Sequence, residues 1–330
     1  MDFSKLPSDI ILLIIETVVA QQKIGFDISE WKSNLELLAV CQSWRCTGIP
    51  QLYRVCYIFS SSSTGSIYAE ISTNLGLAVV GGYFPHIKTV VINTDWYVFL
   101  SADMNAILGR LSNIAAVWPR VNKLVLNCNY EFNGYGEVDQ AEQEAIAVKL
   151  PERFVQLFPH VRKLFMDNET YYDVHKSMYV SLANRYLDQL QVLMHVRFAF
   201  NSQYFSQHIN AESLVKLSMI DMPNTNFWLL FKNPFTNLRY LDYSYGNNWD
   251  ASSESLQLQP RFPGLSMLQI NCLHGQCPVL ANGMFPDTIE KLDIRLSSET
   301  ADLFKNMHLD KILPIYQRFR TWIAHCHLSI

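Results

Sequence analysis

The side chains best suited to chemistry are few and scattered in this 330-residue chain. Cys272, His274 and Cys277 lie close together, and three further candidate metal ligands follow near the C-terminus: His325, Cys326 and His327. Thiolates and imidazoles are ordinary zinc ligands, but this spacing matches no common zinc pattern, and Pro278 favours a plain turn. The sequence therefore predicts neither a metal site nor a cofactor.

Other candidates for catalysis also favour a structural interpretation. His195 stands at an expected core position, where a hydrogen-bonded interior histidine is commoner than a general base. Glu142 and Glu144 fall on an expected exposed helix face. The sequence contains no Gly-rich phosphate loop, no nucleophile elbow and no His-Glu-x-x-His segment. We therefore expect a protein that is not an enzyme.

The amino-acid composition indicates which classes of partner and which cellular compartment to expect. Hydrophobic residues make up 49% and charged residues 17%, with a net charge of -4, which indicates a packed protein and argues against binding to nucleic acid. The apolar stretch Ile10–Ala20 is interrupted by Glu16 and is too short to span a bilayer, and it lacks the flanks of a secretory signal. Seven cysteines without a regular framework indicate reduced thiols. We expect no membrane partner and a cytoplasmic or nuclear location.

A repeated apolar triplet predicts the elements that position these side chains. An apolar anchor is followed three and five positions later by further apolar residues, at anchor intervals of 34, 40, 29, 24, 24, 27 and 24 residues. The triplets are Ile87-Val90-Ile92, Val121-Leu124-Leu126, Val161-Leu164-Met166, Leu190-Leu193-His195, Leu214-Leu217-Met219, Leu238-Leu241-Tyr243, Leu265-Leu268-Ile270 and Ile289-Leu292-Ile294. Residues three and five along share one strand face, and stacked parallel strands bury that face together. Leu52-Val55-Tyr57 echoes the triplet, so we expect an edge strand over Tyr53–Phe59.

The residues expected just before and at the end of the strands support the same architecture. An aromatic-proline step precedes five of them: Phe84-Pro85, Trp118-Pro119, Phe158-Pro159, Phe262-Pro263 and Phe285-Pro286. Four strands are expected to close at Asn93, Asn127, Asp167 and Asn271, whose side chains can accept backbone donors. Two segments carry helical spacing and should form an outer layer: Ile107, Leu111, Ile114 and Trp118, then Ile146, Leu150, Phe154 and Leu157. Asn129–Gln140 has the composition of a surface loop.

The sheet face opposite the apolar triplets is the expected surface for a target protein. Residues four past each anchor change from apolar to polar or acidic along the chain. A partner with an apolar side chain beside acidic groups would suit the region of Lys123, Lys163 and Phe165. The alternative is that loops cover this face. The candidate binding residues are Lys123, Val125, Lys163, Phe165, Met194, Lys216, Tyr240 and Asp242.

The N-terminal segment has a different character. Leu6-Pro7-Ser8-Asp9 is a helix-start signal, and the following helix is apolar on every side over 10–15, so it must be buried all round. A second helix is expected over roughly Asn34–Cys46. Two short helices carry more apolar surface than they can hide from each other. Either a partner protein covers the excess, or the repeat region does.

These segments resemble an F-box. The Leu-Pro opening, Val40-Cys41-Gln42-Ser43-Trp44-Arg45 and the exit Pro50-Gln51-Leu52-Tyr53 occur in the family's order. F-box proteins use this hairpin to dock on the Skp adaptor of SCF ubiquitin ligases, which binds a cullin scaffold, while a C-terminal region holds the substrate. The resemblance implies the following adaptor-binding residues: Leu6, Pro7, Ile10, Ile11, Ile14, Leu38, Val40, Cys41 and Trp44. The segment between the helices, Gln21–Ser33, is longer than is usual in the family.

The repeats behind this segment resemble leucine-rich repeats, and the whole chain is similar in style to divergent fungal F-box proteins. The expected fold is α/β: an F-box-like helical hairpin over 1–56, then an irregular leucine-rich-repeat solenoid over 57–330 with a parallel sheet inside and helices outside. Residues Leu303–Leu328 are expected to contain a helix that ends in Trp322-Ile323-Ala324 and caps the last strand. The resemblance implies the substrate-recognition subunit of an SCF-type ligase. The alternative function is a repeat scaffold outside any ligase, whose N-terminal helices pack only on its own solenoid.

Overall fold

The computed structural model describes residues 6–20, 36–61, 70–95, 102–129, 140–168, 173–197, 212–222, 234–245, 262–272, 287–296 and 321–326. The chain divides into two compact units, Met1–Val161 and Arg162–Ile330. This division falls inside the third apolar triplet, so it does not bear on the predicted module boundary at residue 56, which stays a prediction. Among the described residues, no helix combines the length and the apolar character that crossing a membrane would require.

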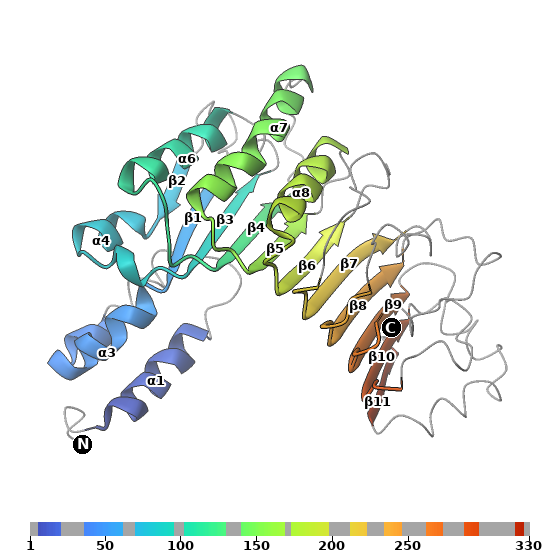
Figure 1. Ribbon diagram of the computed structural model, residues 1–330. Helices are drawn as coiled ribbons and strands as arrows, with labels where there is room; N and C mark the ends of the chain where they lie inside the picture. Colours follow the sequence, from blue (N-terminus) through green and yellow to red (C-terminus); the bar gives the residue numbers. More distant parts are fainter. Residues whose placement is uncertain are drawn as a thin grey trace. The chain divides into compact units, whose positions relative to one another are not determined.

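The first unit begins with helices and continues as a sheet. Its helices and short 3-10 helices are α1 (Ser8–Ala20), η2 (Glu36–Ala39), α3 (Gln42–Leu52), α4 (Leu75–Val80), η3 (Phe84–His86), α6 (Ala102–Ile114) and α7 (Gln140–Leu157). Its strands are β1 (Val55–Ser61), β2 (Glu70–Thr73), β3 (Thr89–Asp95) and β4 (Lys123–Asn129), in the order β4-β3-β1-β2. β4, β3 and β1 are parallel, and β2 is antiparallel to β1. The helices α4, α6 and α7 lie on one face of these strands (Figure 1).

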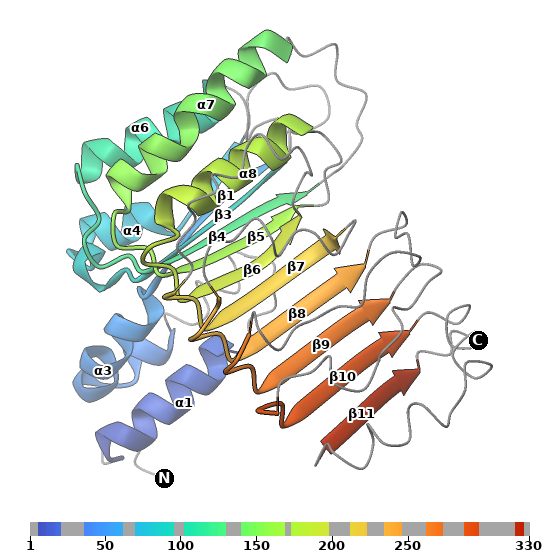
Figure 2. The same cartoon turned by 45° about the vertical axis from the view of Figure 1, so that its right-hand side comes forward.

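The second unit is a parallel sheet in chain order. Its strands are β5 (Lys163–Asn168), β6 (Val192–Arg197), β7 (Lys216–Met222), β8 (Tyr240–Tyr245), β9 (Met267–Cys272), β10 (Lys291–Leu296) and β11 (Thr321–Cys326). The helix α8 (Asp173–Tyr186) packs against β6. Figure 2 shows these strands side by side with α8 over β5 and β6.

The apolar triplets form the core of the sheet, as predicted. Equivalent residues pair across neighbouring strands: Val90 with Leu124 and Ile92 with Leu126 in the first unit, and Leu268 with Leu292 in the second. The described anchors and the residues three further on are all buried. The α/β architecture with a parallel sheet and covering helices is therefore the one that the repeat pattern predicts.

A backbone relay sets the register where each strand begins. The carbonyl one residue past an anchor accepts two N–H groups from the start of the next strand. Lys88 O accepts from Asn122 N and Lys123 N at 2.9 and 3.2 Å, and Gln191 O accepts from Val215 N and Lys216 N at 2.8 and 3.0 Å. The same arrangement recurs at five further carbonyls: Arg54, Arg162, Val215, Arg239 and Ser266.

Aromatic rings link successive repeats, as the aromatic-proline steps predicted. The Trp118 ring meets Phe84 edge-on with centroids 4.6 Å apart, and it meets Phe158 at 5.7 Å. In the second unit, Phe262 packs against Phe235 at 5.2 Å. Trp118, Phe158, Phe235 and Phe262 are buried, so this column of rings is part of the core.

The first strand differs from the prediction by one residue. Val55 pairs with Thr89 and Cys56 with Val90, so the true triplet is Tyr53-Cys56-Ile58, and all three of its side chains are buried. The predicted echo Leu52-Val55-Tyr57 was therefore wrong in register. A shift of one residue exchanges the two faces of a strand. Nor is β1 an edge strand, because β2 pairs with its outer side.

His195 does not replace a core residue, as the sequence suggested. The pairing of β6 with β7 shifts register between Leu193 and Val196, so Val196 pairs with the core position Met219. Two residues of β6, Met194 and His195, then stand opposite one residue of β7. This is a β-bulge, which restores the apolar row one residue later.

The C-terminal segment also differs from the prediction. Residues 321–326 form the strand β11, in which Trp322 pairs with Leu292 and Ala324 with Ile294. The sequence predicted part of a capping helix here, whereas the segment continues the sheet by one further strand. The other residues of the predicted cap lie outside the described ranges.

The outer helices match their predicted faces with one exception. Ile107, Leu111 and Trp118 are buried, but Ile114 at the end of α6 is exposed. All four predicted residues of α7 are buried. α8 was not predicted, and it follows a spacing of four residues through Met178, Leu182 and Tyr186, all of which are buried.

Candidate functional site

The helices α1, η2 and α3 form a small module with its own core, called here the head. Ile11, Ile15 and Trp44 are buried against one another. Leu6, Ile14 and Cys41 are partly buried and pack on this cluster. The start of α1 is the predicted one, because Pro7 O accepts from Ile10 N and Ile11 N at 3.1 and 3.0 Å.

A buried glycine lets the three head helices approach closely. A Cβ on Gly48 of α3 would lie 2.9 Å from Ile15 Cδ1 and would also overlap Leu38 Cδ2. Contacts this short are almost never seen for real Cβ atoms, so a larger residue here would require the ends of the buried Ile15 and Leu38 side chains, or α3 itself, to shift. The sequence gives no periodic signal that would have picked out Gly48.

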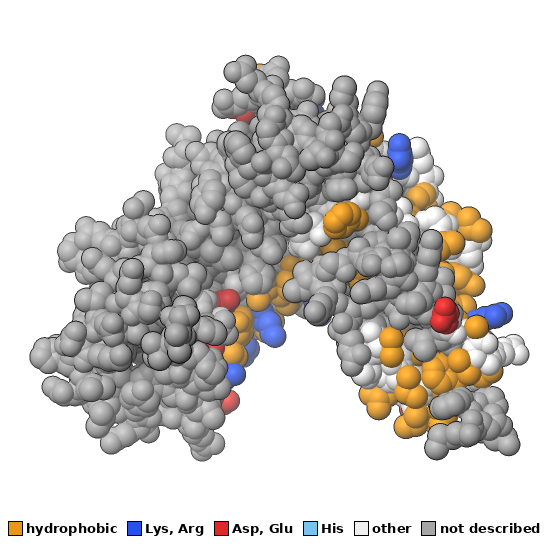
Figure 3. All heavy atoms as spheres, turned by 180° about the vertical axis from the view of Figure 1, so that it is seen from behind, with side chains coloured by type: hydrophobic (Ala, Val, Ile, Leu, Met, Phe, Trp, Pro, Cys, Tyr) orange, Lys and Arg blue, Asp and Glu red, His pale blue; other side chains and the backbone are white. Residues whose placement is uncertain are grey.

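A second set of apolar side chains on the head faces solvent. The exposed fractions are 40% for Ile10 and 60% for Leu13 on α1, and 48% for Val40 between η2 and α3. Hydrophobic side chains gather over these helices at the lower right of Figure 3. The head thus leaves part of the apolar surface of α1 uncovered, as the sequence predicted for a module too small to bury this helix all round.

The residues predicted to bind the adaptor fall into three groups. Ile11, Leu38 and Trp44 are buried; Leu6, Ile14 and Cys41 are half-buried; and Pro7, Ile10 and Val40 are exposed. The head thus brings all of them into one module but leaves only some of them accessible. Leu13 is exposed beside them and was missed, although it lies in the helix that the sequence marked as apolar all round.

The second predicted helix is broken in two. η2 ends at Ala39, Cys41 is extended with φ -166° and ψ 175°, and α3 then runs from Gln42 to Leu52. The helix thus extends past Pro50, beyond the predicted end at Cys46. The predicted inter-helix insertion, Gln21–Ser33, lies outside the described residues.

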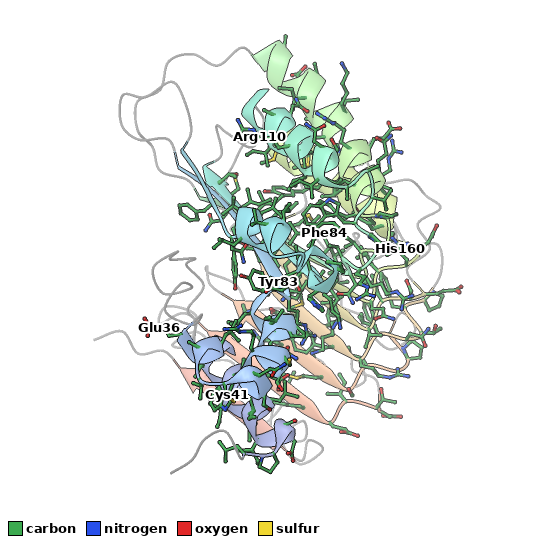
Figure 4. All side chains as sticks on the ribbon, turned by 90° about the vertical axis from the view of Figure 1, so that its left-hand side faces the viewer. Glu36, Cys41, Tyr83, Phe84, Arg110 and His160 are labelled. Atoms are coloured by element: carbon green, nitrogen blue, oxygen red, sulfur yellow. The ribbon has the colours of Figure 1, made fainter. Side chains whose placement is uncertain are left out.

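An aromatic contact packs the end of α3 against the start of the first sheet, and Asn74 hydrogen-bonds to β1 within that sheet. The rings of Tyr53, at the end of α3, and Tyr83 lie 4.6 Å apart, and Figure 4 shows Tyr83 above Cys41 and the head. The buried Asn74 accepts from Tyr57 N through Oδ1 and donates to Val55 O through Nδ2, both at 2.9 Å. Asn74 therefore continues the pairing of β1 where β2 ends.

The predicted target-binding residues lie on the sheet face opposite the triplets. In the first unit, Lys123 and Val125 on β4 are half-buried. In the second unit, Lys163 and Lys216 are exposed. Three residues of the second unit are half-buried: Phe165, Met194 and Tyr240.

Asp242 belongs to a buried polar network. It is 8% exposed, and its Oδ2 accepts from Ser218 Oγ at 2.9 Å while its Oδ1 accepts from Asn271 Nδ2 at 2.8 Å. Asn271 thus donates to a side chain of a neighbouring strand, and the prediction that its side chain also accepts a backbone donor stays a prediction. Both carboxylate oxygens of Asp242 are engaged within the sheet.

The described chemistry-bearing residues do not form a reactive cluster. Burial raises the pKa of the Cys56 thiol to about 12, although a hydrogen bond with Thr73 opposes the rise, so this cysteine is protonated at neutral pH. Among the described residues, no group of three His, Cys, Asp or Glu side chains could hold a metal ion. His274, Cys277 and His327 lie outside the described ranges, so the metal candidates stay untested.

No model of a known protein family matches the sequence, and no curated protein matches it either.

Proposed function

We propose that this chain is the substrate-recognition subunit of an SCF-type ubiquitin ligase. In this proposal the head docks on a Skp-type adaptor and through it on a cullin scaffold, the repeat region binds a target protein, and the chain is non-catalytic and acts in the cytoplasm or nucleus. The observation that carries the proposal is the exposed apolar set of Ile10, Leu13 and Val40 on a module whose core is already complete.

The head separates two roles between neighbouring residues of one helix. Ile11 and Ile15 are fully buried and hold α1 on α3, whereas Ile10 and Leu13 present their side chains to water. Exposing large aliphatic side chains together is unfavourable unless a partner covers them. A second helical protein with an apolar groove would cover them, as in other helix-in-groove complexes. The F-box motif residues occur in the same head, which supports an adaptor as that partner.

The test measures binding of the full chain to a purified Skp-type adaptor by calorimetry. We expect Ile10→Asp and Leu13→Asp each to weaken binding at least tenfold, because a carboxylate would have to be buried in an apolar interface. Val80→Asp is the matched control, since Val80 is 89% exposed on α4 of the same unit. Circular dichroism should show all three variants folded. The proposal fails if the wild type does not bind, or if Val80→Asp loses as much affinity as the head variants.

A repeat scaffold outside any ligase is the second candidate function. The observation in its favour is that Ile11, Ile15 and Trp44 pack within the head without any partner. In that case the wild-type chain would not bind the adaptor, and Ile10→Asp would leave the stability and the other interactions of the chain unchanged.

A further inference from the structure

On the second unit, the sheet face opposite the triplets carries lysines and apolar side chains in register. Where the strands begin, Lys163 on β5 pairs with Val192 on β6, Val192 pairs with Lys216 on β7, and Lys216 pairs with Tyr240 on β8. Lys163 and Lys216 are exposed, and Val192 between them is half-buried. The Lys216 Nζ lies 5.6 Å from the centroid of the Tyr240 ring. Two exposed cations therefore flank one apolar position.

The next row along the same strands enlarges the apolar position. Phe165 pairs with Met194, two residues past Lys163 and Val192 on the same face. Both side chains are half-buried. Phe165, Val192 and Met194 together form an apolar seat, named here for these three residues, with a lysine on each side.

A buried carboxylate on the neighbouring strand β8 is engaged by other partners. Asp242 on β8 accepts hydrogen bonds from Ser218 and Asn271 with its two oxygens. The ammonium group of Lys216 lies over the Tyr240 ring. The seat thus presents the positive charge of Lys163 and Lys216 to an incoming partner.

We propose that this seat binds an acidic segment of the target protein, in which one apolar side chain is flanked by carboxylates. This inference rests on the proposed function for the role of the sheet, but it makes a separate claim about chemistry. The apolar side chain enters the seat, and the carboxylates meet Lys163 and Lys216. Charge complementarity selects the partner, and burial of the apolar side chain contributes affinity.

Strand geometry sets the spacing of the recognised segment. Lys163 and Lys216 are two strands apart, which is about 10 Å. An extended segment crossing the strands advances about 3.3 Å per residue, and its side chains alternate between two faces. Carboxylates two positions before and two positions after the apolar residue therefore share its face and span about 13 Å, which the long lysine side chains can bridge. A single acidic residue beside the apolar one would engage one lysine only.

The experiment selects a random twelve-residue peptide library, displayed on phage, on the full wild-type chain. We expect enrichment of peptides with acidic residues on both sides of a large apolar residue. A synthetic fluorescein-labelled peptide of the enriched sequence should bind in anisotropy measurements. The doubly substituted Lys163→Glu, Lys216→Glu chain should bind it at least tenfold more weakly. Lys88→Glu with Lys149→Glu is the matched control, because both lysines are exposed in the first unit and the charge change is the same.

The outcomes separate this claim from the proposed function. Adaptor binding of the Lys163→Glu, Lys216→Glu chain should equal that of the wild type, so failure of adaptor docking leaves the peptide result intact, and the reverse also holds. No enrichment, enrichment of basic peptides, or equal loss of affinity in the control chain overturns the proposal. So does equal binding of a labelled twelve-residue oligothymidylate, which would indicate a phosphate site. Replacement of the central apolar residue of the peptide by serine should also weaken binding, and unchanged affinity would count against the seat.

Discussion

At the scale of the residue, Asn74 stands out because its side-chain amide pairs with the backbone of β1 as a neighbouring strand would. It occupies the N-cap position of α4, where an asparagine commonly accepts from its own helix, yet no such bond forms. Its amide instead completes the hydrogen bonding of β1 at Val55 and Tyr57. Thr73 Oγ1 takes over at the helix and accepts from Leu75 N at 3.1 Å. An asparagine before a short apolar run is typical of a helix start, and this second role leaves no mark in the sequence.

Asn74→Ala should lower the free energy of unfolding by about 2 kcal/mol, because it leaves the part-buried Tyr57 N–H and Val55 C=O without this partner. Urea unfolding followed by circular dichroism measures the loss. Asn237→Ala is the control: its amide donates to Glu212 O at 2.7 Å on the exposed surface, so water can replace it at a cost below about 1 kcal/mol. Equal losses in the two variants would contradict the role assigned to Asn74.

At the scale of the element, the head shows what a sequence can and cannot specify. A helix that is apolar on every side has no periodicity from which its buried face can be chosen. Ile11 and Ile15 are the buried residues of α1, because they contact Trp44 where α3 packs on α1. The same uncertainty explains β1, where Val55 and Tyr57 are as apolar as Cys56 and Ile58, so both registers fit the pattern. The later triplets were predicted correctly where a charged or polar residue, such as Lys123 or Asp293, marks the other face.

Gly48→Ala should destabilise the head by about 1–3 kcal/mol, because the added methyl group would force α3 away from Ile15 and Leu38. Tryptophan fluorescence should report the change through Trp44. Gly109→Ala in α6 is the matched control, since nothing lies within 4 Å of a Cβ there, and it should stabilise the chain by up to about 1 kcal/mol. If both variants are stabilised, the close crossing of the head helices is refuted.

At the scale of the whole molecule, the number of strands exceeds what the triplets alone predicted. β11 has Trp322 and Ala324 at its core positions, and the stretch Trp322-Ile323-Ala324 shows no alternation of apolar and polar residues that would separate strand from helix. The prediction that His195 occupies a core position was wrong for a related reason. A β-bulge moves the apolar row of β6 by one residue, which a template with fixed spacing cannot predict. Neither wrong prediction changes the expected architecture, because paired backbone hydrogen bonds set the register independently where a strand begins.

Stability should fall in alkaline solution. Burial raises the pKa of Cys56 from 9.0 to about 12 and also raises the pKa of the Tyr186 hydroxyl. The folded chain therefore keeps these protons when the unfolded chain has lost them. Their contribution is fully present below about pH 9 and is lost as the pH rises from there toward 12, at about 1.4 kcal/mol per pH unit for Cys56 alone.

The measurement is urea unfolding in reductant at pH 8 and pH 10.5. Cys56→Ala should lower stability at pH 8 but should show a shallower decline with pH than the wild type. Cys46→Ala is the control, since Cys46 is exposed and its loss should leave the pH slope unchanged. A wild-type slope equal to that of Cys56→Ala would show that the thiol does not titrate with unfolding.

The relay of carbonyls between strands carries a consequence for how such a chain can change in length. At each junction two backbone N–H groups at the start of a strand donate to the carbonyl one residue past the previous anchor. These bonds do not depend on the length of the segment that connects the two strands. Whole repeats are therefore interchangeable cassettes: excision from Leu214 through Asn237 would bring Leu238 to the site that Leu214 left, with Val215 O and Arg239 O in equivalent positions. A lineage could lengthen or shorten its recognition surface in such steps without redesigning the fold.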